Sequence, residues 1–427
     1  MKKTLLFLSI LLIMTACSKT AVKPVPPTQP PVEPVENPIE KPCVCPEQPT
    51  PVQLPNKGTD KPPEITPPTS TSKTLQYDLL QPASWEALDG LLGDNLVTAW
   101  PAWLQSCTSL IKKAQWKPAC EAATAISKPN NATIIDYLST HFDVYQAQNE
   151  DGSTTGLVTG YYQPLLNGSR KKSAKYPYPL YRVPDDLITV ELADAYPDLK
   201  YKRVRGKLAG KKLVPYSTRA EIDAKPSPLA GSELFWINDI IDVFFLQIQG
   251  SGVVQLENGE QVQVGYANQN GHSYHSIGRI LVQRGDLELH QASMQGIKNW
   301  ARNNLDKLQA LLNSNPSYVF FRELPSGLPG PLGALGVPIT AERSIAVDRK
   351  FIPLGAPVFL STTQPNSTKP LKQLMVAQDT GGAIKGGVRA DFFWGAGNKA
   401  GAKAGSMKQE GKVWVLLPKG FKLAEEK

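Results

Sequence analysis

The stretch of residues 374–397, LMVAQDTGGAIKGGVRADFFWGAG, limits the fold more than any other part of this sequence. Its apolar run at 374–377 is long enough for one buried β-strand. The paired glycines after Asp379 and Thr380 end that run, because glycine adopts backbone angles that other residues avoid. Residues 390–394 form a second strand-like run, which further glycines close. The pattern predicts two short strands joined by a turn and a connector.

The second of these runs places a carboxylate, Asp391, directly before three aromatic residues at 392–394. A carboxylate beside rings is poorly solvated when ionised, so its pKa should rise. A raised pKa suits a general acid, and aromatic rings suit a cleft that binds sugars. Asp348 and Asp379 also stand at the ends of strand-like runs. Local turn capping is the alternative for all three, strongest at Asp379, where Asp-Thr-Gly-Gly is good turn chemistry, and weakest at Asp391.

A second polar cluster combines Gln247, Gln249 and Ser251 with an Asn-, Gln- and His-rich segment at 268–276. Side-chain amides beside aromatic faces can hold sugar hydroxyls and N-acetyl groups, and an ordinary polar loop explains the composition equally well. The four histidines show no ligand spacing, so no metal site is predicted. Neither a nucleophile elbow nor a phosphate loop is present.

The overall charge is mildly basic. The chain has 427 residues and a net charge of +8, enough length for two domains and additional segments. A positive surface fits an anionic polymer such as a cell wall with peptide carboxylates, or equally a solvated surface without a specific acidic partner. No Lys/Arg-rich run contains interleaved aromatic residues, so nucleic-acid binding is not predicted.

The first residues are typical of an export signal. Two lysines at positions 2 and 3 precede an apolar core at 5–14, which is too short to span a bilayer permanently. Met14-Thr15-Ala16-Cys17 then resembles the lipobox of bacterial lipoproteins, in which Cys17 becomes the lipidated first residue. The serine at position 18 implies the outer membrane. The alternative is an ordinary signal peptide with an incidental cysteine at position 17.

Residues 18–73 are rich in proline and form a predicted tether. Such a composition cannot bury enough apolar surface to fold, and it favours extended polyproline conformations. At about 3.1 Å per residue, this tether could hold the folded body more than roughly 100 Å from the membrane. A partner-binding proline motif is the alternative. Cys43 and Cys45 lie in this segment, where they could crosslink to other chains or remain free.

The folded part begins with helices and continues with strands. Cys107 and Cys120 flank a polar stretch among the helices, and an oxidising envelope favours a disulfide between them. The tryptophans of this part are expected in the core. Helical spacing occurs at 84–93, 100–113, 118–127, 131–142, 277–283 and 289–312. Strand-like runs occur at 156–164, 261–266, 318–322, 345–347, 358–360, 374–378, 391–394 and 412–417, with a hydrophobic block at 234–248 in the strand-rich part.

Several long motifs occur in an order that resembles the membrane-bound lytic murein transglycosylase A (MltA) family. They cover essentially all of residues 75–417, and the last of them resembles the three-aspartate (3D) domain of that family. The motifs are GYYQP at 160–164, FFLQIQGSG at 244–252, GYANQNGHSYHSIGR at 265–279, NPSYVFFRE at 315–323 and the segment 343–405.

The resemblance implies a mainly β fold with α-helices, built as two domains. Residues 74–164 and 267–420 would form the main domain, with helices and a double-psi β-barrel that includes the 3D segment. Residues 165–266 would form a smaller β-barrel inserted into it. A murein glycan strand would bind in the groove between the two.

The resemblance also implies a reaction. The family cleaves the β-1,4 bond between N-acetylmuramic acid and N-acetylglucosamine without water or a cofactor, and the muramic 6-hydroxyl attacks its own C1 to give a 1,6-anhydro end. Asp391 matches the catalytic carboxylate, first acid and then base. Asp379 would position or polarise it, and Asp348 is the more structural of the three. The predicted sugar contacts are Tyr161, Gln249, Ser251, Gly252 and Tyr274.

Two other functions remain open at this point. A water-using muramidase would need two carboxyl groups about 6.5–9.5 Å apart if inverting or about 5–5.5 Å apart if retaining. A non-catalytic lipoprotein that binds the wall needs neither. In each case the lipid on Cys17 would place the protein on the periplasmic face of the outer membrane, with peptidoglycan as its partner.

Overall fold

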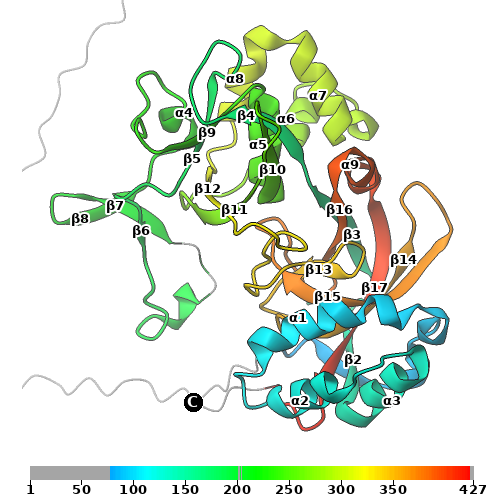
Figure 1. Cartoon of the computed structure of the whole chain (residues 1–427). Coiled ribbons are helices and arrows are strands. Elements are labelled where there is room, and N and C mark those ends of the chain that lie inside the picture. Colours follow the sequence, from blue (N-terminus) through cyan, green and yellow to red (C-terminus); the bar gives the residue numbers. More distant parts are fainter. Residues whose placement is uncertain (1–76, 201, 203, 424–427) are drawn as a thin grey trace, which may run out of the picture. The chain divides into compact units, whose positions relative to one another are not determined.

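A computed structural model describes residues 77–200, 202 and 204–423 (Figure 1), which fall in one compact unit, Ser70–Lys427. The predicted signal peptide, the tether and three of the cysteines, at 17, 43 and 45, lie outside the described residues. None of the helices in the described part is both long and apolar enough to cross a membrane.

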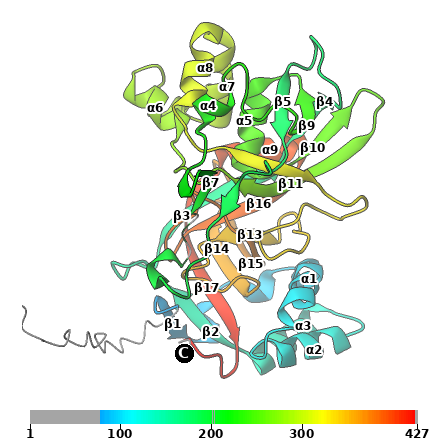
Figure 2. The same cartoon turned by 90° about the vertical axis from the view of Figure 1, so that its left-hand side faces the viewer.

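Three helices form a group beside the short strands β1 (Leu80–Ala83) and β2 (Phe142–Ala147), as Figure 2 shows. Trp103 is buried among them and donates a hydrogen bond from Nε1 to the Tyr137 hydroxyl at 3.0 Å. Trp100 and Trp116 are buried as well, which confirms the predicted aromatic core, while Trp85 packs against it only partly buried. Cys107 and Cys120 form a disulfide with Cα atoms 5.2 Å apart. The helices are α1 (Trp100–Leu110), α2 (Lys117–Ala125) and α3 (Asn131–His141).

The helix predicted at 84–93 is wrong. The structure has two separate 3-10 turns there, Trp85–Ala87 and Leu91–Gly93. Gly90 lies between them with φ +97°, a left-handed conformation that interrupts a right-handed helix and that glycine adopts without steric cost.

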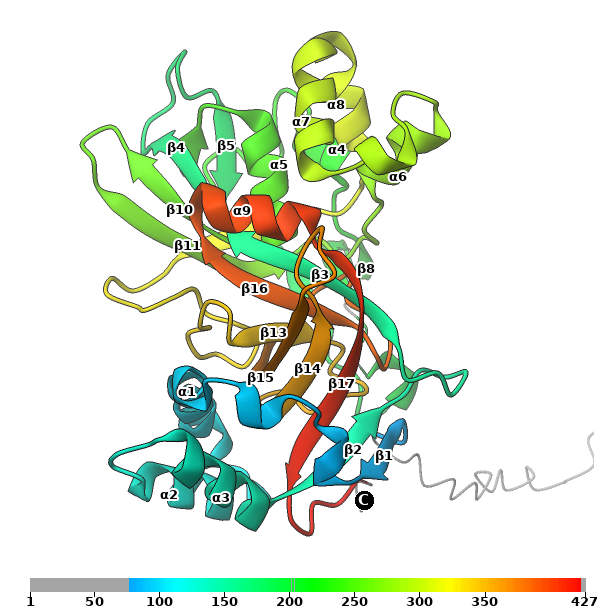
Figure 3. The same ribbon diagram turned by 90° about the vertical axis from the view of Figure 1, so that its right-hand side faces the viewer.

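Six strands close into a ring (Figure 3). β17 pairs with β14 on one side and with β3 on the other, so the order β17-β14-β15-β13-β16-β3 returns to its start. Closure leaves none of these six strands as a free sheet edge. This barrel confirms the predicted mainly β fold. Its strands are β3 (Gly156–Gln163), β13 (Ser344–Val347), β14 (Pro357–Thr363), β15 (Pro370–Asp379), β16 (Ala390–Ala396) and β17 (Lys408–Pro418).

A second sheet follows the barrel directly, because Pro164 alone separates β3 from β4. Its strand order is β12-β11-β10-β4-β9-β5, and a three-stranded sheet, β6-β7-β8, accompanies it. β12 joins this sheet although it lies beyond residues 165–266, the range predicted for the inserted domain. The strands are β4 (Leu165–Ser169), β5 (Tyr178–Tyr181), β6 (Ile188–Thr189), β7 (Arg205–Ala209), β8 (Lys212–Pro215), β9 (Glu233–Ile237), β10 (Ser251–Leu256), β11 (Gln261–Gln269) and β12 (Val319–Glu323).

The hydrophobic block at 234–248 is a strand and a helix rather than one strand-rich segment. β9 ends before Asp239, whose Oδ1 accepts the Ile241 N–H at 2.7 Å and begins α5 (Ile240–Gln249). Gly250, with φ +77°, ends that helix. Because most of α5 is buried, its sequence is apolar nearly all round and lacks the alternation of exposed and buried residues that identifies a surface helix.

The remaining helices cover parts of both sheets. The helix predicted at 289–312 is divided at Asn304, whose backbone leaves the helical region with φ −139° and ψ 52°. α9 packs against β3 and β16, and Gly160 allows this, since a Cβ there would lie 2.7 Å from Trp394 Nε1 and 2.9 Å from Ala404 Cα. The helices are α4 (Arg219–Ile222), α6 (Ile277–Gln283), α7 (Met294–Asn303), α8 (Leu305–Asn313) and α9 (Gly397–Ser406).

Candidate active site

Strand pairing brings Asp391 and Asp379 into one row across the barrel wall. On β16, Asp391 lies opposite Thr159 of β3 and opposite Ala346 of β13. Ala346 in turn lies opposite Asp379 of β15. Directly paired residues project from the same face of a sheet. The two carboxylates therefore lie on the same face of the sheet. Their Cα atoms are separated by two strand spacings, about 9–10 Å measured across the strands.

A β-bulge turns Asp379 onto that face. The β13–β15 pairing advances from Ile345↔Ala377 to Ala346↔Asp379, so Gln378 is the extra residue. Gln378 is fully buried, where it accepts a hydrogen bond from the Ser344 hydroxyl and donates to the Ala102 carbonyl at 2.8 Å. Without the bulge, Gln378 would occupy the place of Asp379 in the row and Asp379 would project from the opposite face.

Asp391 is held by its neighbour on β3. The Thr159 hydroxyl donates to Asp391 Oδ1 at 2.5 Å. Burial raises the pKa of Asp391, while the Thr159 hydrogen bond and the positive charge of Arg389 act in the opposite direction. The predicted direction of this pKa shift is confirmed, although strand alternation leaves only Phe393 of the three rings on the Asp391 face. Phe392 and Trp394 pack into the main core on the other side.

Asp379 uses both carboxylate oxygens to accept hydrogen bonds. Oδ1 accepts the Ala334 N–H at 2.9 Å and the Thr380 N–H at 2.8 Å. Oδ2 accepts the Tyr161 hydroxyl at 3.0 Å. Burial nonetheless raises the pKa of Asp379 to about 6, against the lowering effect of these three bonds. Three donors thus hold the Asp379 carboxylate in a fixed orientation within the row.

Tyr161 and Phe393 form the apolar floor beside the two carboxylates. Their ring centroids are 5.1 Å apart, and both rings belong to a small buried cluster that also contains Ala346, Ile339 and Ile384. Burial and the nearby Asp379 and Asp391 carboxylates raise the pKa of the Tyr161 phenol, so it remains a hydrogen-bond donor.

Three of the predicted sugar contacts lie at the junction of α5 and β10, two elements that both contact β3. Gln249 ends α5, and its Oε1 accepts the Tyr162 N–H at 2.9 Å. Ser251 is buried at the start of β10. A Cβ on Gly252 would lie 2.5 Å from Leu246 Cδ1 and 3.1 Å from the Pro164 carbonyl oxygen, so a side chain there would have to displace Leu246. Their contact with sugar stays a prediction, and so does that of Tyr274, which is 39% exposed before α6.

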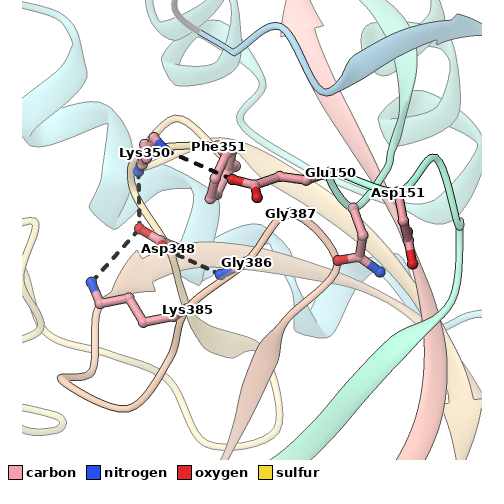
Figure 4. A pocket seen from close by; sticks show the side chains of 9 residues that line it. Glu150, Asp151, Asp348, Lys350, Phe351, Lys385, Gly386 and Gly387 are labelled. Carbon is pink, nitrogen blue, oxygen red and sulfur yellow. Dashed lines mark hydrogen bonds and ion pairs between the residues drawn. The ribbon is translucent and has the colours of Figure 1, made fainter.

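Asp348 lies apart from the row, in a pocket of about 610 Å³ between three loops (Figure 4). The Asp348 carboxylate accepts the Gly386 N–H and the Lys350 N–H, each at 3.2 Å, and it lies 3.9 Å from Lys385 Nζ. These contacts hold the loop that leads into β16. They fit the structural assignment of Asp348, which itself stays a prediction.

Sequence reasoning missed Thr159, which donates a hydrogen bond to Asp391, and Arg389, whose positive charge lowers the Asp391 pKa. Thr159 lies in the middle of β3, just before the GYYQP motif, and is 232 positions away from Asp391, whereas Arg389 directly precedes β16. Only the parallel pairing of β3 with β16 brings them together. Over the residues that the structure describes, no three His, Cys, Asp or Glu side chains gather closely enough to hold a metal ion.

The raised pKa of Asp379 predicts a measurable pH dependence of stability. Between the ordinary carboxyl pKa of 3.8 and the folded value of about 6, the folded state binds more protons than the unfolded state. The free energy of unfolding therefore falls as pH rises through this interval. Asp379→Asn removes this fall, so from pH 4 to pH 7.5 the variant should gain roughly 2–3 kcal/mol relative to wild type.

Urea unfolding at pH 4 and pH 7.5 measures this difference. Asp306→Asn, at an exposed position of α8, is the matched control and should follow wild type at both pH values. A variant Asp379→Asn that also follows wild type would show that the Asp379 carboxylate is already well solvated.

Comparisons with known proteins identify relatives of this chain. The MltA specific insert domain matches residues 157–322, and the 3D domain matches residues 343–417. Membrane-bound lytic murein transglycosylase A of Escherichia coli K12 is 33% identical over 283 residues, 64% of this chain and 69% of that protein.

Solved structures extend the similarity. The crystal structure of MltA from Neisseria gonorrhoeae, monoclinic form, has 35% identity and a TM-score of 0.70 over 82% of this chain and 94% of that one. E. coli MltA with bound chitohexaose has 26% identity and a TM-score of 0.58 over 75% of this chain and 90% of that one. On these matches in sequence and fold, the chain belongs to the membrane-bound lytic murein transglycosylase A family.

Proposed function

We propose that this protein is a lytic transglycosylase of peptidoglycan, which cleaves the β-1,4 bond between N-acetylmuramic acid and N-acetylglucosamine without water. One observation carries this proposal: the row contains a single carboxylate, Asp391, with an oxygen that is not engaged, beside a second carboxylate that is fully engaged. A reaction whose substrate supplies its own nucleophile needs only one such group.

The reaction uses Asp391 twice. Protonated Asp391 first donates its proton to the glycosidic oxygen, and the bond from C1 of the muramic residue to that oxygen breaks. The ionised carboxylate then accepts the proton of the muramic 6-hydroxyl as O6 bonds to C1, closing the 1,6-anhydro ring. This restores the protonated acid, and the exchange of acid and base roles resembles that of retaining glycosidases.

The raised pKa of Asp391 suits both steps. A buried carboxyl group holds its proton to higher pH than a solvated one, which favours its action as an acid and its recovery of the proton as a base. Asp379 lies two strands away as a fixed, hydrogen-bonded negative charge that can stabilise positive charge developing on the sugar. We assign Asp379 this supporting role and Asp348 the structural role of holding the loop before β16.

Glycan binding is the next part of the proposal. The E. coli relative binds chitohexaose, an oligomer of N-acetylglucosamine. We propose that the glycan lies across the carboxylate row in the groove between the main and the inserted domain. Its sugars would contact five residues, Tyr161, Gln249, Ser251, Gly252 and Tyr274.

The location is proposed from the sequence and from the name of the relatives, which are called membrane-bound. A lipid on Cys17 would anchor the protein to the outer membrane, and the Pro-rich segment would extend it into the periplasm toward the wall. Metabolic labelling with a radioactive fatty acid tests this, because Cys17→Ala should lose the label.

Product analysis tests the function most directly. Purified murein is digested with the full chain, and the muropeptides are analysed by mass spectrometry. Products one water lighter than the corresponding reducing-end muropeptides are expected. Reducing ends would instead indicate a muramidase, which the engaged oxygens of Asp379 argue against. Binding to murein without any product would indicate a wall-binding lipoprotein.

A further inference from the structure

Arg389 donates a hydrogen bond to Thr159, and Thr159 donates one to Asp391. The order of donors along this chain determines which oxygen of Asp391 can carry a proton. We propose that Arg389 and Thr159 are positioning residues that confine the transferable proton of Asp391 to Oδ2. The inference deepens the proposed function and rests on it for its role in the reaction, whereas the placement of the proton rests on geometry alone.

The direction follows from the donors available. Arg389 Nη2 lies 2.9 Å from Thr159 Oγ1, and a guanidinium has only donors. Thr159 therefore accepts from Arg389 and cannot donate to it. The single hydroxyl proton of Thr159 points instead to Asp391 Oδ1, 2.5 Å away. Oδ1 is thus an acceptor, so a proton on Asp391 belongs on Oδ2.

Arg389 is itself fixed by the two strands that it joins. Its Nη1 donates to the Ala390 carbonyl at 2.5 Å and to the Leu157 carbonyl at 3.2 Å. Ala390 directly precedes Asp391, and Leu157 stands two residues before Thr159 on β3. The planar guanidinium therefore has little freedom to turn, and its second nitrogen is aimed at Thr159.

Few other charged groups face Asp391. Arg389 directly precedes β16, Tyr161 belongs to β3 and Asp379 to β15, and each of the three is coupled electrostatically to Asp391. Lys408 of β17 lies opposite Thr159 in the strand pairing and is exposed. β13 contributes only the methyl group of Ala346 at this point of the row.

The free oxygen is consequently the one that meets substrate. No hydrogen bond to Asp391 Oδ2 occurs within residues 77–200, 202 and 204–423. The same atom can thus deliver the proton to the glycosidic oxygen and receive it from the 6-hydroxyl, without rotation of the carboxyl group between the two steps. Fixing the reactive atom in this way is the kind of preorganisation that catalysis requires.

We call the hydrogen-bond chain from Arg389 through Thr159 to Asp391 the relay, and two substitutions break it at different points. Thr159→Val keeps the side-chain shape and removes the donor, and Arg389→Met keeps much of the length and removes the guanidinium. Both remove a group that favours ionised Asp391. In each variant the Asp391 pKa should therefore rise, by roughly one unit. Thr159→Ser and Arg389→Lys are the conservative variants, and Thr159→Ser should restore the wild-type pKa.

The pKa is read without substrate by NMR titration of the carboxyl carbon in the full chain labelled with ¹³C-aspartate. The Asp391 signal is assigned as the one missing from Asp391→Asn. Arg284→Met, at an exposed position after α6, is the charge-matched control and should leave the Asp391 titration unchanged.

Activity on murein gives the second readout. Reaction begins with protonated Asp391, so the alkaline limb of kcat/KM should move to higher pH in Thr159→Val and Arg389→Met. At the optimum, kcat should fall roughly tenfold with little change in KM, because proton placement rather than binding is lost. A merely structural role would lower activity without moving the limb.

The outcomes separate the two proposals. Unchanged Asp391 titration in both folded variants would overturn the relay, whatever the products of murein digestion are. Shifted titration together with reducing-end products from wild type would keep the relay and overturn the transglycosylase function.

Discussion

Asp391→Asn is expected to abolish murein cleavage, with a loss of roughly 10²–10⁴-fold or more. An amide can neither give a proton to the glycosidic oxygen nor take one from the 6-hydroxyl. The fold should survive, because the Asn side-chain oxygen can still accept from Thr159 and no charge is left to bury. Release of anhydro-muropeptides measures the activity, and thermal unfolding checks the fold.

The control for this experiment is Asp136→Asn on the exposed side of α3, which should keep wild-type activity. A folded Asp391→Asn variant with even a tenth of wild-type turnover would contradict the single-acid mechanism. Another carboxylate would then have to supply the proton, and Asp379 would be the next residue to mutate.

Arg343→Met is expected to produce the largest loss of stability. Arg343 and Asp94 form a buried bidentate pair at 2.8 and 2.9 Å, and their side chains are only 10% and 6% exposed. Removing one partner leaves a buried charge without its counterion, which costs about 3–5 kcal/mol. Urea unfolding should therefore show a much lower midpoint at an unchanged slope.

A second substitution tests the cause. Asp94→Leu combined with Arg343→Met removes both charges, so the double variant should regain part of the stability lost in Arg343→Met. No recovery would show that the hydrogen bonds to the backbone, such as Leu374 N–H to Asp94 at 2.8 Å, matter more than the charges.

This pair also supports the site. Arg343 directly precedes β13, and its Nη1 donates to the Leu374 carbonyl of β15 at 2.9 Å. β13 carries Ala346 and β15 carries Asp379, the two residues that lie in one row with Asp391. Arg343→Met should therefore lower activity in proportion to the folded fraction. Faster hydrogen exchange of the Asp379 amide would show that the row itself has become less rigid.

The sequence predicted the C-terminal strands well, because short apolar runs between glycines and polar turns have few other conformations. It also predicted the direction of the Asp391 pKa shift, whereas the role of Asp391 as the acid stays a prediction. Helix α5 was missed for a physical reason: burial on most sides removes the periodicity that distinguishes helix from strand.

The arrangement around Asp391 could not be predicted from local patterns. Thr159 meets Asp391 only because β3 closes the barrel against β16 and β17, a pairing between distant segments. The facing of Asp379 depends on a bulge whose extra residue, Gln378, looks like any other strand residue in the sequence. The amide side chains predicted as sugar ligands include Gln249, which here supports the backbone of β3.

Because of the bulge in β15, the face to which Asp379 points depends on the exact number of residues in the strand. One residue inserted between Ala377, the partner of Ile345, and Asp379 would turn Asp379 to the opposite face of the strand, so its carboxylate would leave the row and enter the core. Point changes along β15 alter one side chain at a time. Evolution can consequently vary the chemistry of this strand far more freely than its length.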